Sequence, residues 1–156
     1  MEKKNLTACF TGHRVLQESP VKVKERLEEV ITELVEDGFC YFIAGGALGF
    51  DTLAAQVILE LRNRKYSHIN LLLALPFRGQ EKAWSAINQA VYNNIKQKAD
   101  CVVCLSETYL PFCMHKRNKY MVDNSSVCIC YLRENKGGTM FTVKYATENE
   151  RTLIHL

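Results

Sequence analysis

The stretch Phe42-Ile-Ala-Gly-Gly-Ala-Leu-Gly-Phe-Asp51 joins an apolar run to a segment whose apolar residues recur every three or four positions. This order predicts a buried strand, a glycine turn and the start of a helix. Glycine at positions 45, 46 and 49 lets the backbone approach a ligand closely, and the free N–H groups of a first helical turn favour an anion. The dinucleotide-binding pattern G-x-G-x-x-G is met only in part, because Ala44 stands at its first glycine. The stretch therefore predicts a phosphate site, with a plain strand-to-helix turn as the alternative.

Apolar runs of strand length alternate with helical patterns along the rest of the chain. The runs cover residues 6–10, 39–43, 69–75, 100–105 and 127–132, with a final short one at 152–156. This alternation predicts a single α/β domain over residues 1–156, with a three-layer, doubly wound and mostly parallel sheet of the Rossmann-like type. We expect the helix after the third strand to return the chain across the sheet, which would place the strand at 100–105 beside the first strand.

Polar or glycine-rich turns follow several of these strands, and ligands bind at the carboxyl edge of such sheets. We therefore expect a nucleotide or a nucleotide-derived ligand at that edge. The guanidinium groups of Arg14 and Arg117 each offer a fixed fork of donors for a phosphate. The predicted ligand-binding residues are Gly12, His13, Arg14, Gly45, Gly46, Gly49, Asp51, Arg117, Asn118, Gly137, Gly138 and Thr139.

Each of these residues also has a structural interpretation. Arg14 can be a solvated surface arginine, and His13 can bond only its own turn. Asp51 lies in a first helical turn, where a carboxylate stabilises the helix dipole. Arg117 lies in the basic segment 115–119, and such segments are usually solvated faces. The Thr139 hydroxyl can simply cap its helix.

The composition narrows the function classes. A net charge of +3 is too small to indicate nucleic-acid binding by itself. No apolar run approaches the ~18 residues of a membrane span, and the N-terminus has no signal-peptide pattern, so we expect a cytoplasmic protein without membrane contact. Seven cysteines include Cys101-x-x-Cys104 and Cys128-x-Cys130. Both pairs lie inside strand-like runs, whereas zinc sites usually place such pairs on turns, and no metal site is predicted.

These motifs, in this order, resemble the SLOG superfamily (the Smf/DprA and LOG-like Rossmannoid proteins), and in particular its YpsA-like branch. The resemblance covers nearly the whole chain. It implies a domain that binds nucleotides or nucleotide-derived signals such as ADP-ribose-like molecules, commonly as a homo-oligomer of two or more copies. In the DprA branch it implies single-stranded DNA as an alternative partner. The motifs are Gly12-His-Arg14, Gly45-Gly-Ala-Leu-Gly-Phe-Asp51, Leu75-Pro-Phe-Arg-Gly-Gln80, Arg117-Asn118 and Gly137-Gly-Thr139.

One departure from the family pattern concerns catalysis. LOG enzymes cleave the N-glycosidic bond of a cytokinin nucleotide with an arginine and a glutamate, and Arg117 stands four residues before a methionine, as in their motif. Their glutamate has no counterpart here, because the run 136–142 carries Thr142 at that place. The resemblance therefore implies a sensor or regulator rather than an efficient catalyst. If the protein is an N-glycosidase or a deoxyribosyltransferase, Asp51 or Asp123 would take the place of the glutamate.

Overall fold

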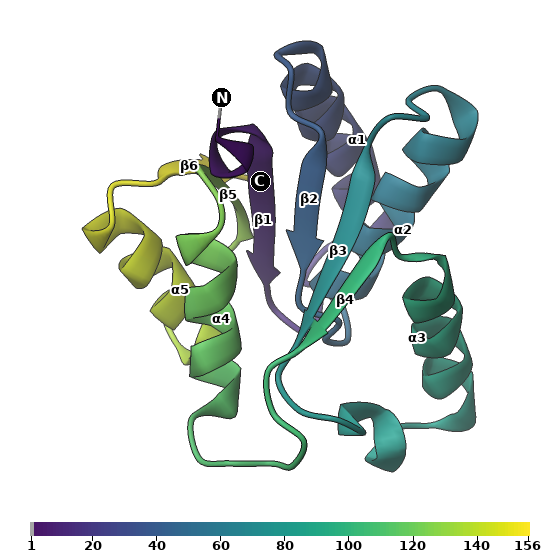
Figure 1. The fold of residues 1–156 in the computed structure, drawn as a ribbon, viewed down its shortest axis with the longest axis vertical. Coiled ribbons are helices and arrows are strands. Elements are labelled where there is room, and N and C mark those ends of the chain that lie inside the picture. The colour runs from purple at the N-terminus through teal and green to yellow at the C-terminus, as the bar shows by residue number, and fades with distance from the viewer. Residues whose placement is uncertain (1) are drawn as a thin grey trace.

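Six parallel strands form one sheet in the computed structural model, which describes residues 2–156 (Figure 1). Their order across the sheet is β4-β3-β2-β1-β5-β6. The predicted Rossmann-like α/β fold is confirmed. The strands are β1 (Thr7–Gly12), β2 (Tyr41–Ala44), β3 (Asn70–Leu75), β4 (Cys101–Cys104), β5 (Val127–Tyr131) and β6 (Thr152–His155).

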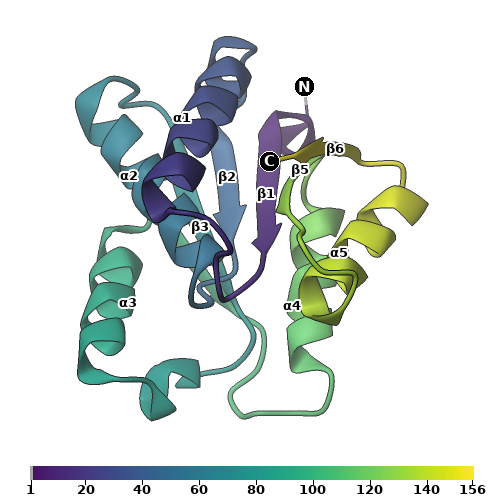
Figure 2. The same cartoon turned by 180° about the vertical axis from the view of Figure 1, so that it is seen from behind.

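Helices cover both faces of the sheet, which explains why its central strands are almost continuously apolar. The first three helices pack on one face and the last two on the other (Figures 1 and 2). They are α1 (Pro20–Glu36), α2 (Phe50–Arg64) and α3 (Ala86–Lys98) on the first face, and α4 (Cys113–Asp123) and α5 (Gly137–Glu148) on the second. Two short 3₁₀ helices, Lys3–Leu6 and Gln80–Ala83, complete the secondary structure. No helix of residues 2–156 combines the length and the apolar character needed to cross a membrane.

The expected position of the fourth strand is wrong. β4 pairs with β3 at the edge of the sheet, and β5 is the strand that lies beside β1. The reason is that α3 packs on the same face as α1 and α2, so its right-handed crossover continues outward instead of returning. The segment between β4 and α4 carries the chain back, and α4 covers the opposite face. The strand order therefore reverses between β1 and β5, and the carboxyl ends of this pair form the crevice where ligands bind in such folds.

The core beneath this reversal is aromatic. Phe10 of β1 packs against Phe42 of β2, with ring centroids 6.3 Å apart. Phe50 of α2 stacks on Tyr131 of β5 at 5.6 Å. All four side chains are fully buried. They form a rigid floor under the carboxyl ends of β1 and β5, where loops carrying polar residues begin.

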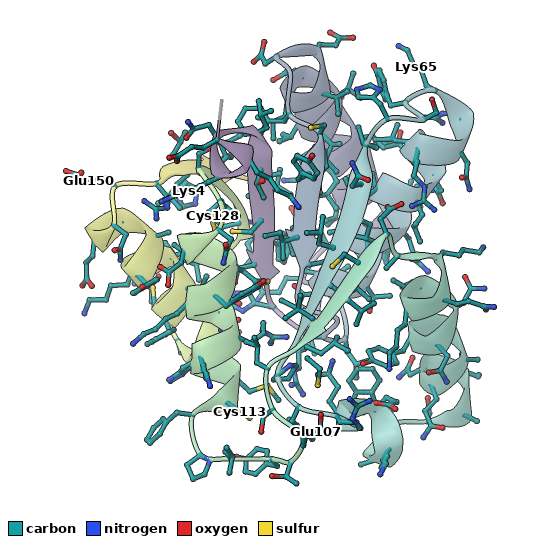
Figure 3. The ribbon with its side chains drawn as sticks, in the orientation of Figure 1. Lys4, Lys65, Glu107, Cys113, Cys128 and Glu150 are labelled. Atoms are coloured by element: carbon teal, nitrogen blue, oxygen red, sulfur yellow. The ribbon has the colours of Figure 1, made fainter. Side chains whose placement is uncertain are left out.

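Two helices end in the same hydrogen-bonded turn with different residues at its critical position. After α1, Gly38 has φ of +103°, and the Phe39 and Gly38 N–H groups donate to Leu34 and Val35. After α5, the N–H groups of residues 151 and 150 make the equivalent bonds to residues 146 and 147. Here Glu150 takes the left-handed conformation, with φ of +60°, and lies at the surface (Figure 3). Glycine adopts this conformation without steric cost, whereas a residue with a Cβ does not.

Replacing Glu150 by glycine should therefore raise the free energy of unfolding by about 0.5–1 kcal/mol. Urea unfolding of the two proteins measures this difference. Lys144→Gly is the matched control, because Lys144 is exposed inside α5, where glycine should destabilise by about 1 kcal/mol. A Glu150→Gly protein that is less stable than the wild type would show that the side chain, not the backbone, governs this turn.

Candidate ligand-binding site

A cavity of about 460 Å³ lies at the carboxyl ends of β1 and β5. The first turns of α4 and α5 form its other walls. Ligand pockets for small molecules commonly have volumes of roughly 300–1,000 Å³. The structure brings most of the predicted residues to this cavity: Gly12, His13, Arg14, Asp51, Arg117, Asn118, Gly137, Gly138 and Thr139 line it.

The three glycines of the central turn lie outside the cavity lining. A Cβ at Gly45 would lie 2.6 Å from an Arg117 nitrogen and 2.8 Å from Oδ2 of Asp51. Glycine at this position therefore leaves the space that the Arg117 and Asp51 side chains occupy. The Gly46 carbonyl accepts a hydrogen bond from Gln80, on the side of the turn away from the cavity. Gly49 packs against the backbone of Arg14 with φ of +78°. In this structure the turn organises neighbouring side chains and loops rather than facing the cavity itself.

Asp51 brings a negative charge into this turn. The Ala47 N–H donates to its Oδ2 at 3.3 Å, and only 6% of the residue is exposed. Burial raises the pKa of Asp51 to about 6, although Arg117, the Ala47 N–H and Arg14 oppose this effect by stabilising the carboxylate. The backbone donors of the turn thus already hold a carboxylate, and this carboxylate forms part of the cavity wall.

Arg117 is buried rather than part of a solvated basic face, with 5% of the residue exposed. Its Nη1 donates to the carbonyl oxygens of Gly45, just after β2, and of Ala74 in β3. Its Nε donates to Asn118 Oδ1 at 2.9 Å. Burial lowers the pKa of the guanidinium, and the negative charge of Asp51 opposes this shift. Arg117 therefore forms the back wall of the cavity and ties α4 to the sheet.

His13 joins two loops. Its Nε2 accepts hydrogen bonds from the backbone N–H groups of Arg133 and Glu134, at 2.8 and 3.1 Å. An imidazole that accepts at Nε2 carries its proton on Nδ1. His13 thus fixes the loop after β5 against the loop after β1, and its Nε2 has no capacity left for a ligand.

The groups that remain open to a ligand are Arg14 and the start of α5. Arg14 is exposed, and no hydrogen bond or ion pair holds its side chain within residues 2–156. Lys136 occupies the N-cap position of α5, but its side chain makes no hydrogen bond to the helix. Gly137, the first helical residue, has φ of +77°. The N–H groups of this first turn therefore meet the cavity without a capping side chain.

Lys136 and Glu134 are the charged side chains of the loop after β5 that line the cavity without belonging to the predicted set. They form an ion pair of 3.0 Å at the surface of the loop after β5. Their position in the sequence, immediately before the glycine pair at 137–138, could have predicted that they lie at the cavity. His115 and Met114 of α4 also line the cavity.

The two positions considered for catalysis differ in location. Asp51 lies in the cavity wall, whereas Asp123 is outside the cavity and accepts a hydrogen bond of 2.7 Å from Tyr145. Thr142, which stands where LOG enzymes have glutamate, is fully buried and donates to the Gly138 carbonyl at 2.8 Å. The cavity therefore holds a single buried carboxylate, together with the exposed, paired Glu134.

The cysteine pairs cannot share one metal ion. Cys101 and Cys104 lie in β4, and Cys128 and Cys130 lie in β5, with three strands between them. Four strand spacings of about 4.8 Å separate the two pairs by roughly 19 Å. Residues 2–156 contain no group of three or more His, Cys, Asp or Glu side chains arranged to hold a metal.

The fold and the position of the cavity define a Rossmann-like α/β protein with its candidate site at the point where the strand order reverses. The model of the YspA SLOG family (YpsA) matches residues 16–154, and the chain belongs to this family. It is 34% identical over 139 residues to the uncharacterized SPbeta prophage-derived protein YoqJ of Bacillus subtilis, covering 81% of each chain. It is also 29% identical over 129 residues to a UPF0398 protein of Brevibacillus brevis, covering 81% of this chain and 68% of that protein.

Solved structures show the same fold at low sequence identity. DNA processing protein A (DprA) of Streptococcus pneumoniae superposes with a TM-score of 0.70 at 18% identity, over 98% of this chain and 50% of the DprA chain. The present chain thus spans about half the length of that protein. DprA of Helicobacter pylori, a protein that binds single-stranded DNA, superposes with a TM-score of 0.68 at 18% identity, over 97% of this chain and 65% of that chain.

Proposed function

We propose that the cavity binds a nucleotide or a nucleotide-derived, ADP-ribose-like ligand, and that the protein acts as a sensor or regulator. The observation that carries this proposal is the meeting of Arg14, Lys136 and the uncapped start of α5 around one cavity. Helix N-termini and guanidinium groups are both suited to phosphate oxygens. The positive charges of Arg14, Lys136 and Arg117 exceed the charge of Glu134 and of a partly protonated Asp51.

The parts of the ligand would occupy different walls. Phosphate oxygens would accept hydrogen bonds from the N–H groups of Gly138 and Thr139 and from the Arg14 side chain. The apolar surface of Met114 and Met121 would contact the base or the ribose. Thr139 is buried, so its hydroxyl would act only on a ligand that reaches the bottom of the cavity.

Replacing Arg14 by alanine should weaken binding about 10- to 100-fold, because it removes a charge-assisted hydrogen bond to the phosphate. Calorimetry with AMP, ADP and ADP-ribose measures the dissociation constants of the wild type and the variant. Arg78→Ala is the matched control, since Arg78 is also exposed but pairs with Glu107 outside the cavity. Absence of binding to every ligand of the panel at millimolar concentration would contradict the proposal.

One observation favours a second function, N-glycosidase or deoxyribosyltransferase activity. Asp51 is a buried carboxyl group in the cavity with a pKa of about 6, which suits a general acid or base near neutral pH. Base release from nucleoside monophosphates, measured for the wild type and for Asp51→Asn, tests this alternative. Turnover that is equal in both proteins would exclude Asp51 as the catalytic group.

The family relationship also supports a cytoplasmic homo-oligomer as part of the proposal. Sedimentation of the purified chain measures the number of subunits, and a monomer at micromolar concentration would contradict this part alone.

A further inference from the structure

A groove on the outer side of α4 and α5 continues from the cavity. Its volume is about 550 Å³, and His115 lines both the groove and the cavity. We call it the aromatic groove and define it by Phe112, His115, Lys116, Lys119 and Phe141. Nothing in the proposed function uses it.

The groove is lined by a series of rings. The imidazole of His115 stacks on Phe141 with centroids 3.9 Å apart and planes 7° apart. Phe112 lies 6.1 Å from His115 on one side, and Tyr145 lies 6.5 Å from Phe141 on the other, with its ring parallel to within 2°. Such surface rings are platforms on which planar bases stack.

Phe112 is the most unusual of these rings. The residue is 77% exposed, and its backbone is left-handed with φ of +63°. A bulky residue in this conformation is an outlier, and outliers of this kind cluster at functional sites. The conformation places an aromatic ring in solvent at the start of α4, beside His115, which also lines the cavity.

Positive charge accompanies the rings. Lys116 and Lys119 are both exposed, and neither takes part in an ion pair within residues 2–156. The Lys119 Nζ lies 5.9 Å from the Phe141 centroid and 5.5 Å from the Tyr145 centroid. Asp123 is the acidic residue of the groove, and Tyr145 donates to it. Rings alternating with lysines are complementary to bases joined by phosphates.

We propose that the aromatic groove binds the second base of a ligand that carries two bases joined through phosphate, with its first nucleotide in the cavity. This inference rests on the proposed function and narrows it to ligands larger than a mononucleotide. Two bases joined through phosphate occur both in a short piece of single-stranded nucleic acid and in a pyrophosphate-linked dinucleotide.

The test compares three adenine ligands by calorimetry: AMP, the 3′–5′-linked dinucleotide pApA, and diadenosine pyrophosphate. At least one two-base ligand should bind the wild type about 10-fold more tightly than AMP, because one further base stacks. Tighter binding of pApA would identify the ligand as single-stranded nucleic acid, and tighter binding of diadenosine pyrophosphate would identify it as a pyrophosphate-linked dinucleotide. Phe112→Asn should abolish this gain while leaving AMP binding unchanged, and asparagine tolerates the left-handed backbone. Lys119→Met should reduce the gain about 3-fold or more through the lost charge.

Tyr109→Ala is the matched control, since Tyr109 is 65% exposed on the preceding loop and packs against Phe77 outside the groove. It should retain the full gain. Equal affinity of the wild type for all three ligands, or a gain that survives in Phe112→Asn, would overturn the inference and leave the proposed function standing. Failure of all three ligands to bind would also overturn the inference, while the proposed function would still be decided by ADP and ADP-ribose.

Discussion

Replacing Arg117 by methionine should lower the free energy of unfolding by about 3–5 kcal/mol at pH 7, because it removes a buried cation whose charge stabilises a buried carboxylate. The substitution leaves the Gly45 carbonyl without its donor and leaves Asp51 buried without the nearby cation. In a chain of this length the loss corresponds to a fall in melting temperature of roughly 10–15 °C. Thermal and urea unfolding measure it.

A second substitution distinguishes the charge from the packing. Asp51→Asn should recover part of the loss in the double variant, with a coupling of about 1 kcal/mol or more between the two sites. Arg78→Met is the control, because Arg78 is exposed and its ion pair with Glu107 should contribute less than about 1 kcal/mol. An Arg117→Met protein as stable as Arg78→Met would mean that water reaches the site and that Arg117 is not a structural residue.

Replacing Gly49 by alanine should cost roughly 3–5 kcal/mol, since two unfavourable effects add. The backbone has φ of +78° and ψ of −119°, a region that residues with a Cβ rarely adopt. An added Cβ would also lie 2.7 Å from the Cα of Arg14 and closer still to its carbonyl group. The loops after β1 and β2 would have to separate, so urea unfolding should show the loss and Arg14 should no longer be held beside the cavity.

Gly38→Ala serves as the comparison for this variant. Gly38 has φ of +103°, but a Cβ there would meet nothing within 4 Å. Only the backbone effect remains, and the expected loss is about 1–2 kcal/mol. Equal losses at the two positions would contradict the close approach of Gly49 to the loop after β1.

The strands and their outward order from β1 to β3 were predictable from the sequence, but the place of the fourth strand was not. The glycine stretch indicated β2, the turn and α2, and the apolar runs indicated the other strands, because periodicity is a local property. The place of β4 depends on the face that α3 covers. Both candidate faces are apolar, so the pattern of α3 itself does not reveal its partner. Even its buried side was only partly foreseeable, since Ile87 has the helical spacing of a core residue and is 78% exposed.

The site was predictable where it depends on strand ends and less so where it depends on burial. Turns after parallel strands must share an edge, which is why Gly12, Arg14 and Gly138 were correctly expected to meet. The burial of Arg117 was missed because its neighbours in sequence are basic. A helical spacing of four residues from Cys113 to Arg117 and on to Met121, all buried, was the signal that places it on the apolar side of α4.

The pairing of β1 with β5 is a seam between two stretches of chain that are far apart in sequence, since residues 7–12 meet residues 127–131 there. The cavity lies over this seam, with Arg14 on one side and Gly138 on the other. A molecule that contacts both sides would raise the free energy needed to separate β1 from β5. The increase is RT ln(1 + [L]/Kd), where [L] is the ligand concentration and Kd its dissociation constant. If the proposed ligand binds, amide protection should rise in β1 and β5, and less so in β4 at the far edge of the sheet.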